Sequence, residues 1–589
     1  MEKTGIRKKE NRIYFFLFLL VWCIQMLTAV YFCCQKQGFH EDEYYTYYST
    51  ARTYGLMIED GAWMERDTYF NEFVVLEGQG FQYGLVKLVQ SWDVHPPVYY
   101  WLFHTVCSFF PGQFSKWFGL GINLAAFGFS LFLLRCLSLK VTGYNEKLSL
   151  FVCFFYGFTP AAMSSVVFIR MYALLTVFVY LCTILHVDVV ERDREAIGPL
   201  SGERQKGKCQ ERNAREGKLP FGRFLLPLMV VTYLGFLTQY YYFIFLFFMA
   251  FAFCIYLLWR DRDLWNCIRY GVSLAAAFVL AYLTYPACLG QMFRGQRGAQ
   301  ATSNFFDLSN TWMRIGFFWK LLDEYVFGKT LLPLIALAVI GAAFAGAAVR
   351  KRKKCAEIQE GKKQPGICEG IQGWWKGHAA YGLLFLAVTG YFLTVSKTAL
   401  LLGNTSVRYQ TPIYGMVVLL LFGAVWGGWN DCCELCNGKE GHGYQKGSRN
   451  GKRFLTAAAV LYVLTGLFGL FSGRVVFLYP EAAERVAFAR EKAAEDVPVV
   501  CLYDAGQSWC VWDCADEFFE YDRIYFASQN DAEPISDAAI SQSGELVVYL
   551  SNTADGQEQL ERILNSNSNL AAYELLYQEK YCDVYYFHE

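Results

Sequence analysis

Two adjacent carboxylates, Asp42 and Glu43, follow the first long apolar run of this 589-residue chain. They stand in the stretch FHEDEYYTYY, residues 39–48, among four tyrosines. A carboxylate pair beside aromatic rings can supply a general base and a metal ligand. The alternative is a solvated acidic loop, and the preceding Glu41 leaves open which carboxylate would act.

Cations and aromatic residues that could bind a phosphate or a sugar follow farther along the chain. Arg170, Lys397 and Arg408 are candidate phosphate partners, arginine as a bidentate fork and lysine as a point charge. Lipid headgroups are the alternative partner for such cations. His95 could bind a metal or a phosphate, or could belong to a helix entry. The tyrosine run 240–242 could stack on a sugar or form part of an interfacial aromatic belt.

The composition indicates a polytopic membrane protein. Apolar residues make up 54% of the chain, aromatic residues 18% and charged residues 18%, with a net charge of zero. Ordinary soluble domains contain about 25% charged residues. The neutral balance argues against a nucleic-acid partner, and the apolar content excludes disorder. The 20 cysteines are scattered, many of them in apolar runs, and do not indicate a disulfide framework.

Eleven apolar runs are long enough to cross the hydrocarbon core of a bilayer, which takes roughly 20 helical residues. The first run follows a basic N-terminus and lacks a cleavage site for a signal peptide, so we expect an uncleaved span. A long uncharged stretch is divided at the polar-aromatic TQYYY, residues 238–242. The predicted spans are 13–34, 117–134, 148–167, 173–188, 224–239, 240–259, 270–289, 330–349, 379–396, 410–429 and 454–473.

The apolar segment 96–110 decides the topology, because its 15 residues are short for a crossing. If this segment does not cross, the six loops on the N-terminal side hold 33 Lys and Arg in 123 residues, and the opposite loops hold 13 in 140. Basic loops stay inside. We therefore predict an interfacial helix at 96–110 on the outer surface, 11 spans, an inner N-terminus and an outer C-terminus.

The chain changes character near residue 475. Short runs at 497–504, 545–551 and 582–587 have the length and the β-branched or aromatic content of strands, and 556–566 has helical spacing. These features predict a transmembrane domain over 1–474, whose first outer loop is 35–116, and a small extracytoplasmic α/β domain over 475–589.

The unusual polar residues gather at the predicted outer ends of the spans. By this assignment no Lys or Arg lies inside a span. Channels and transporters usually carry ionisable residues within their spans. The distribution therefore favours an active site at the outer membrane surface.

Five stretches resemble, in their order, the GT-C class of polytopic glycosyltransferases that use polyprenyl-phosphate sugars. Within this class, they are most similar to the bacterial branch related to protein O-mannosyltransferases and lipid A aminoarabinose transferases. The resemblance extends from residue 1 to about residue 475. The stretches are FHEDEYYTYY (39–48), DVHPPVYYWLFH (93–104), FIRMYALL (168–175), TQYYYFIF (238–245) and RYQTPIY (408–414).

The resemblance implies roles for these residues. Asp42 would be the base that deprotonates the acceptor hydroxyl, and Glu43 would orient neighbouring groups or a divalent metal. His95 would lie near the donor. The cations expected to hold the donor phosphate are Arg170, Lys397 and Arg408, and the residues expected to line the substrate are Tyr172, Tyr241 and Tyr409. Some relatives carry a second acidic residue where this chain reads IRMY, which puts a two-carboxylate metal site in doubt.

The sequence thus predicts a bacterial multi-pass cell-membrane enzyme that transfers a hexosyl or pentosyl group from a polyprenyl-phosphate carrier to an extracytoplasmic glycan, lipid or protein, with inversion. Two alternatives stay open. A flippase or transporter of lipid-linked sugars would function without Asp42. An inactive scaffold for envelope assembly would keep its partners when Asp42 is replaced.

Overall fold

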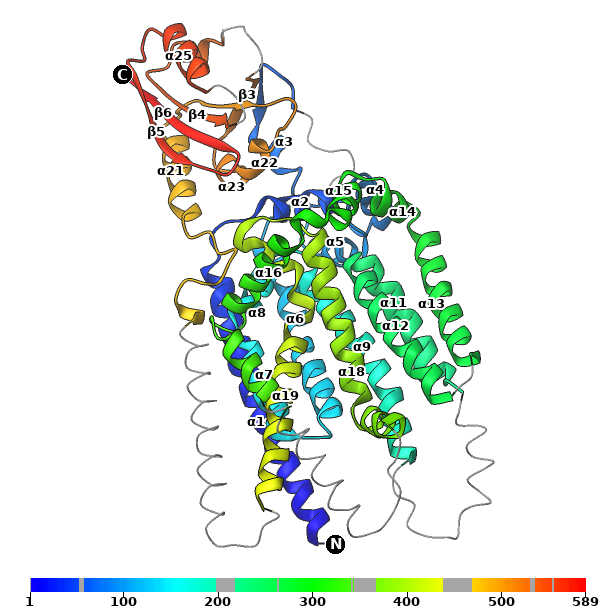
Figure 1. Cartoon of the computed structure of the whole chain (residues 1–589). Coiled ribbons are helices and arrows are strands. Elements are labelled where there is room, and N and C mark those ends of the chain that lie inside the picture. Colours follow the sequence, from blue (N-terminus) through cyan, green and yellow to red (C-terminus); the bar gives the residue numbers. More distant parts are fainter. Residues whose placement is uncertain are drawn as a thin grey trace, which may run out of the picture.

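The structure is a computed structural model that describes residues 2–51, 58–197, 218–261, 264–340, 343, 367–437, 469–529, 535, 537–552 and 556–589. Figure 1 shows three parts in succession: a bundle of long helices, a rim of short helices and a mixed sheet. The N-terminus lies at the end of the bundle that is distant from the sheet. We call the opposite end, next to the sheet, the sheet end of the bundle.

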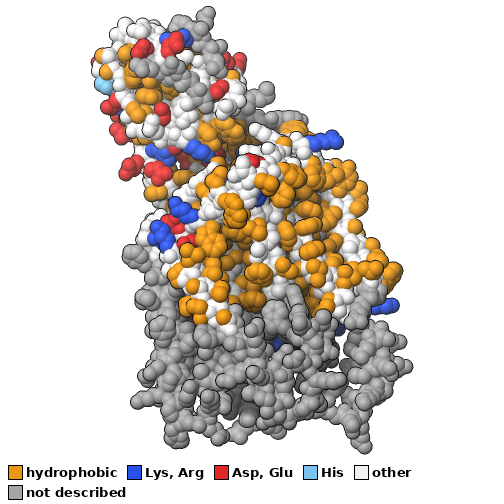
Figure 2. Space-filling view, viewed as in Figure 1, with side chains coloured by type: hydrophobic (Ala, Val, Ile, Leu, Met, Phe, Trp, Pro, Cys, Tyr) orange, Lys and Arg blue, Asp and Glu red, His pale blue; other side chains and the backbone are white. Residues whose placement is uncertain are grey.

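Seven helices in the described part of the chain are long and apolar enough to cross a membrane, and two bent helix pairs raise the number to nine. Apolar side chains are abundant on the described part of the bundle face that Figure 2 shows, as expected where lipid surrounds helices that satisfy their own backbone groups. The straight spans lie in α1 (Glu2–Gln35), α6 (Lys116–Val141), α9 (Tyr172–Ile197), α11 (Leu226–Thr238) with η1 (Phe221–Leu225), α12 (Tyr241–Asp261), α13 (Trp265–Thr284) and α18 (Ile367–Thr398).

Nine of the predicted spans coincide with these helices and bent pairs. Helix α11 ends at Thr238 and α12 begins at Tyr241, as the TQYYY stretch predicted. The predicted span 330–349 is described only in part, as a helix over Leu331–Ile340. The predicted span 454–473 lies almost wholly outside the described residues. The total of eleven spans therefore stays a prediction.

Two bent helix pairs occur in the bundle, and the first of them breaks where the sequence supplies a helix start. Helices α7 (Glu146–Gly157) and α8 (Pro160–Val167) meet at 58°. The hydroxyl of Thr159 accepts the backbone N–H of Ala162 at 3.2 Å, and Pro160 fits the first helical position because that residue needs no intrahelical N–H. The second pair, η3 (Gly403–Tyr409) and α19 (Thr411–Asn437), bends by 76°.

Short helices form the rim at the sheet end (Figure 1). The predicted interfacial helix at 96–110 is α5 (Val98–Ser108), with Pro97 as its N-cap residue. Its 11 residues extend for only about 16 Å, far less than a bilayer core of about 30 Å. The other rim helices are α2 (Glu41–Ala51), α4 (Tyr83–Trp92), α14 (Ala287–Phe293), α15 (Gln296–Phe306) and α16 (Thr311–Tyr325).

The sheet has six strands in the order β1-β3-β2-β4-β6-β5. Strands β2 (Val499–Tyr503), β3 (Arg523–Ser528) and β4 (Glu545–Ser551) run parallel, and β6 (Cys582–His588) and β5 (Ala572–Gln578) continue the sheet in antiparallel pairs. The predicted strands are β2, β4 and β6, and the predicted helix is α25 (Gly556–Ser566), whereas β3 and β5 were not predicted. Four further helices of the described residues belong to this part: α21 (Ala482–Ala494), α22 (Cys510–Asp513), α23 (Ala515–Phe518) and α24 (Ala538–Ser541).

The sixth strand comes from residues 35–116, the loop predicted to be the first outer one. Strand β1 (Ala62–Glu65) pairs antiparallel with β3 and places Ala62 opposite Phe526. The indole of Trp63 donates to the carboxylate of Asp537 at 3.0 Å. Residues 475–589 therefore do not build the sheet alone, because its edge is completed by a strand from the loop that also carries the acidic motif.

Candidate active site

The acidic motif lies at the start of a rim helix. Helix α1 ends at Gln35, the chain turns, and α2 begins at Glu41. Glu41, Asp42 and Glu43 thus form the first turn of α2. The partial positive charge at a helix N-terminus favours carboxylates in this position. The three side chains nevertheless take different environments.

The Asp42 carboxylate lies between two guanidinium groups. Its Oδ2 is 3.1 Å from Nη2 of Arg408, and its Oδ1 is 3.7 Å from Nη2 of Arg170. The Asp42 side chain is 30% exposed, whereas each arginine side chain is only 4% exposed. Burial raises the pKa of Asp42, but the two arginines outweigh it, so that the pKa is lowered well below its usual range. Asp42 is therefore an accessible carboxylate that is ionised in this arrangement.

His95 and Asp93 extend this cluster. The Nδ1 atom of His95 is 3.0 Å from Oδ2 of Asp93, and its ring nitrogens are 3.3 Å from Nη2 of Arg170. Burial raises the pKa of Asp93, but the lowering effect of His95 and Arg170 is larger, so the net shift of this pKa is downward. The structure thus places His95 beside Arg170, one of the two arginines that hold Asp42.

His40 completes the cluster from the other side. Its Nε2 atom lies 3.4 Å from Nη1 of Arg408, and its Nδ1 atom lies 3.6 Å from Oδ2 of Asp42. Burial lowers the pKa of His40 well below its usual value, despite the attraction of Asp42. This histidine is therefore neutral at pH 7.

Aromatic rings surround the arginines. The guanidinium of Arg408 lies 5.1 Å from the ring centre of Phe168 and 5.0 Å from that of Tyr409. The rings of Tyr172 and Tyr241 each lie 5.9 Å from the ring of Tyr409 in edge-to-face contact. The three tyrosines predicted to line the substrate thus form one wall beside Arg408. Such π faces stabilise a cation and can stack on a sugar ring.

Lys397 does not join this cluster. Its ammonium donates to the Asp307 carbonyl at 2.5 Å, to the Asn310 side chain at 2.6 Å and to the Thr311 hydroxyl at 2.9 Å. A lysine ammonium has three protons to donate, and three oxygen atoms already accept them. Lys397 therefore fastens the end of α18 to the start of α16, and its predicted role as a phosphate ligand does not fit this geometry.

Glu43, predicted to orient neighbouring groups or a divalent metal, contacts neighbouring groups of the protein. Its carboxylate accepts the ammonium of Lys36 at 2.9 Å and the backbone N–H groups of His40 and Ile169, each at 2.7 Å. The Lys36 and Glu43 side chains are both fully buried, and Lys36 also donates to the Phe477 carbonyl at 2.8 Å. Glu43 therefore fixes the loops on either side of Asp42 instead of facing a substrate.

Sequence reasoning gave no role to three residues that the structure brings into the site. His40 and Asp93 contact the cluster directly, and Lys36 neutralises Glu43. The signal for Lys36 was present, because a lysine directly after a span in a loop with few cations needs a partner. The sequence could not show which carboxylate it would contact.

The described residues do not offer a metal site. Among them, no group of three or more His, Cys, Asp or Glu side chains is arranged to hold a metal ion. Glu43, the predicted metal-orienting residue, is occupied by Lys36 and two backbone donors. The donor set therefore does not fit a divalent ion.

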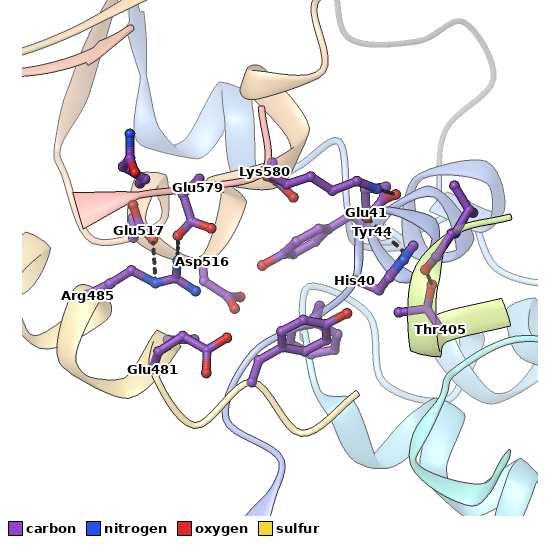
Figure 3. Close-up of a pocket in the computed structure, with 16 residues that line it drawn as sticks. His40, Glu41, Tyr44, Thr405, Glu481, Arg485, Asp516, Glu517, Glu579 and Lys580 are labelled. Atoms are coloured by element: carbon purple, nitrogen blue, oxygen red, sulfur yellow. Dashed lines mark hydrogen bonds and ion pairs between the residues drawn. The ribbon is translucent and has the colours of Figure 1, made fainter. Parts of the chain in front are cut away.

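A cavity of about 460 Å³ adjoins the acidic motif. Figure 3 shows His40 and Glu41, the two residues before Asp42, on one side, and residues of the sheet domain on the other. The Lys580 ammonium contacts the Glu41 carboxylate across this cavity. Carboxylates outnumber cations among the lining residues, which include Glu41, Glu481, Asp513, Asp516, Glu517 and Glu579 against Arg485 and Lys580.

Burial perturbs three of these carboxyl groups. It raises the pKa of Asp516 and of Glu517 to about 7, although Lys36 and Arg485 partly oppose this effect. It raises the pKa of Asp513 to about 6, and the nearby Glu41 adds to the increase. The wall formed by α22 and α23 is therefore partly protonated at neutral pH.

Comparisons with known proteins find likeness only at the level of the whole structure. No family model matches the chain, and no curated protein matches its sequence. ArnT from Cupriavidus metallidurans in the apo state is 11% identical with a TM-score of 0.47, over 99% of this chain and 98% of that one. The same ArnT bound to undecaprenyl phosphate is 10% identical with a TM-score of 0.45, over 98% of each chain. The archaeal oligosaccharyltransferase AglB from Archaeoglobus fulgidus, in complex with an inhibitory peptide and a dolichol-phosphate, is 12% identical with a TM-score of 0.41, over 94% of this chain and 71% of that one.

The buried Lys36–Glu43 pair predicts a specific pattern of stability. Lys36→Met or Glu43→Leu alone leaves one buried charge unpaired and should cost about 3–5 kcal/mol. The double variant should lose less free energy of unfolding than either single variant, since no buried charge is then left unpaired. Thermal unfolding in detergent measures all three. The exposed pair Arg490–Glu520, at 2.8 Å, is the matched control, and its Arg490→Met variant should cost less than about 1 kcal/mol. Equal losses at both pairs would contradict the assignment.

The raised pKa of Asp516 predicts a pH dependence. Between about pH 4 and pH 7 the folded protein holds this proton more firmly than the unfolded chain, so the contribution of Asp516 to the free energy of unfolding falls as pH rises. Asp516→Asn removes this titration. The melting temperature of the variant relative to wild type should therefore increase from pH 5 to pH 8. Asp522→Asn, at an 81% exposed side chain, is the control and should show a flat difference.

Proposed function

We propose that this protein is a membrane glycosyltransferase that moves a sugar from a polyprenyl-phosphate carrier to a hydroxyl group of an extracytoplasmic acceptor. One observation carries the proposal: the accessible carboxylate of Asp42 is held between two buried guanidinium groups at the sheet end of the bundle. A base beside an anion-binding pair is what transfer from a phosphate leaving group requires. The ordered motifs that resemble the GT-C class support the same reaction.

The arginines are suited to bind the donor phosphate in exchange for Asp42. In the described structure the Nε–H of Arg408 is buried and has no hydrogen-bond acceptor. A phosphate that takes this donor, together with the Nη groups of both arginines, would compete directly with the Asp42 carboxylate. Arginine forks bind phosphate in charge-assisted pairs. Donor binding would thus release Asp42 from the contacts that lower its pKa and would turn it into a stronger base.

The proposed chemistry is a single displacement. The acceptor oxygen attacks the anomeric carbon while its proton passes to Asp42. The bond between that carbon and the phosphate oxygen breaks, and its electron pair leaves with the phosphate. Arg170 and Arg408 stabilise the charge that develops on the leaving group. Attack opposite the leaving group inverts the anomeric carbon. No step uses a metal ion, so a chelator should leave the rate unchanged.

The cavity between the acidic motif and the sheet is the proposed approach for the acceptor. Its lining contains His40 and Glu41, the two residues that precede Asp42. Ionised carboxylates only accept hydrogen bonds, so the carboxyl groups of this lining that are ionised favour a partner that donates several of them. A polyhydroxylated glycan or an amino-sugar has this chemistry.

The first prediction from this function concerns Asp42→Asn, which keeps the shape of the side chain but removes its basicity. Loss of a general base costs about 10²–10⁴-fold in rate, so transfer of radiolabel from polyprenyl-phosphate sugars should fall by at least about 100-fold. The assay compares wild-type and variant membranes, with sealed vesicles of both orientations to determine the side of the reaction. Asp67→Asn, at an 86% exposed side chain in the same loop, is the matched control and should keep full activity.

The outcomes distinguish the proposed function from its alternatives. Equal transfer by wild type and Asp42→Asn would remove Asp42 as the base. No transfer from any donor, with lipid-linked sugars still changing sides of the membrane, would favour a flippase. Neither transfer nor translocation would favour a scaffold.

The acceptor path predicts a separate kinetic effect at Glu517. Glu517→Gln leaves the Asp42 cluster intact and changes only the cavity wall, so it should raise the KM for the acceptor several-fold with the KM for the donor unchanged. The control is Glu574→Gln, because Glu574 is exposed on β5. A change in the donor KM alone would place the acceptor elsewhere.

A further inference from the structure

Four cysteines lie buried inside the sheet domain, and the proposed transfer does not use them. Cys501 lies in β2, Cys510 begins α22, Cys514 directly follows α22, and Cys582 begins β6. Each thiol is at most 1% exposed. Scattered cysteines in the sequence did not predict a disulfide framework, but the fold brings these four together.

One pair is much closer than the other. The Sγ atoms of Cys514 and Cys582 lie 3.0 Å apart, although 68 residues separate them in the chain. The Sγ atoms of Cys501 and Cys510 lie 4.0 Å apart. A disulfide has an S–S distance of about 2 Å. A movement of about 1 Å, within the reach of a side-chain rotation, would therefore join Cys514 to Cys582.

The backbone on both sides of the pair is held in place. Cys582 faces Ser551 in the antiparallel ladder of β4 and β6. The backbone N–H of Cys514 donates to the Cys510 carbonyl at 3.4 Å, and its carbonyl accepts the N–H of Phe518 at 3.0 Å. The two sulfur atoms therefore face each other because the sheet and the α22–α23 segment fix them, not because a flexible loop happens to pass nearby.

We propose that Cys514 and Cys582 form a disulfide bond in the mature protein. Each thiol loses a proton, and the pair gives two electrons to the disulfide of a thiol–disulfide oxidoreductase, which is reduced to a dithiol. Disulfides persist in oxidising compartments, which agrees with the outer position that the loop charges predict for this domain. Burial raises the pKa of the Cys514 thiol well above its usual value, so the exchange precedes burial during folding.

The bond would connect two walls of the cavity. Cys514 lies between Asp513 and Asp516 on one wall, and Cys582 follows the turn that carries Lys580 on the other. The ammonium of Lys580 contacts Glu41, beside Asp42. A covalent link here fixes the sheet domain in the shape that contacts the acidic motif.

Peptide mapping of the full-length protein tests the bond directly. The protein is isolated from membranes in detergent, denatured and treated with N-ethylmaleimide without reductant, then digested and analysed by mass spectrometry. We expect a cross-linked pair of peptides that contain Cys514 and Cys582 and that separate after dithiothreitol. Alkylation of both thiols without reduction would overturn the proposal.

Thermal unfolding supplies a second and independent measurement. Cys514→Ser, Cys582→Ser and the double variant should lower the melting temperature by the same several degrees, because the bond needs both sulfur atoms. Dithiothreitol should lower the melting temperature of the wild-type protein by a similar amount and leave that of the variants unchanged. Cys501→Ser, equally buried, is the control and should retain the cross-linked peptides. Additive losses in the double variant, with no effect of dithiothreitol on wild type, would show ordinary packing and overturn the proposal.

Discussion

The contact between the Asp42 carboxylate and two buried guanidinium groups is the constraint on which the rest of the site depends. A buried arginine is costly unless it is paired and hydrogen-bonded. Arg170 meets this condition with Asp42, His95 and the hydroxyl of Thr46, and Arg408 meets it with Asp42 and the Tyr409 hydroxyl. Arg170 lies in the break between α8 and α9, and Arg408 lies next to the break between η3 and α19. These two breaks place both arginines beside Asp42. The ring of Tyr409, in the aromatic wall, lies against the guanidinium of Arg408.

A second buried pair holds this arrangement in position. Lys36 and Glu43 connect the end of α1 to the first turn of α2, and their further contacts reach Ile169 and Phe477. Asp42 is the neighbour of Glu43, so its backbone position follows from that pair. The two adjacent carboxylates of the motif thus differ in role: Glu43 is buried in contacts that hold the fold, whereas Asp42 stays accessible. Breaking the scaffold pair would disturb the site without touching a reacting group.

The sheet domain is coupled to the same motif through Glu41. Lys580 and Tyr581, in the turn between β5 and β6, both contact the Glu41 carboxylate. Strand β1, from the loop 35–116, completes the edge of the sheet, so this loop and the domain share one sheet. Three consecutive acidic residues therefore face the domain, the arginines and the scaffold lysine in turn. In the proposed function, the cavity for the acceptor and the arginines for the donor phosphate therefore both lie next to Asp42.

The sequence by itself determined the features that depend on local pattern. Nine of the eleven predicted spans coincide with apolar helices or bent helix pairs of the described residues, the TQYYY break separated α11 from α12, and proline marked the start of α5. Strands β2, β4 and β6 followed from short apolar runs, whereas β1, β3 and β5 were missed. Most residues of β1 and β5 are exposed or half-buried, so these two strands lack the apolar run of a buried strand. Only the tertiary structure decided the partners. Arg408 and His40 are in contact although 368 residues separate them in the chain. Nothing in the local sequence distinguishes Arg408, which binds Asp42, from Lys397, which binds oxygen atoms at the start of α16. Hydropathy is a property of each segment, but the choice of an ionic partner depends on which side chains the packed helices bring within a few ångströms.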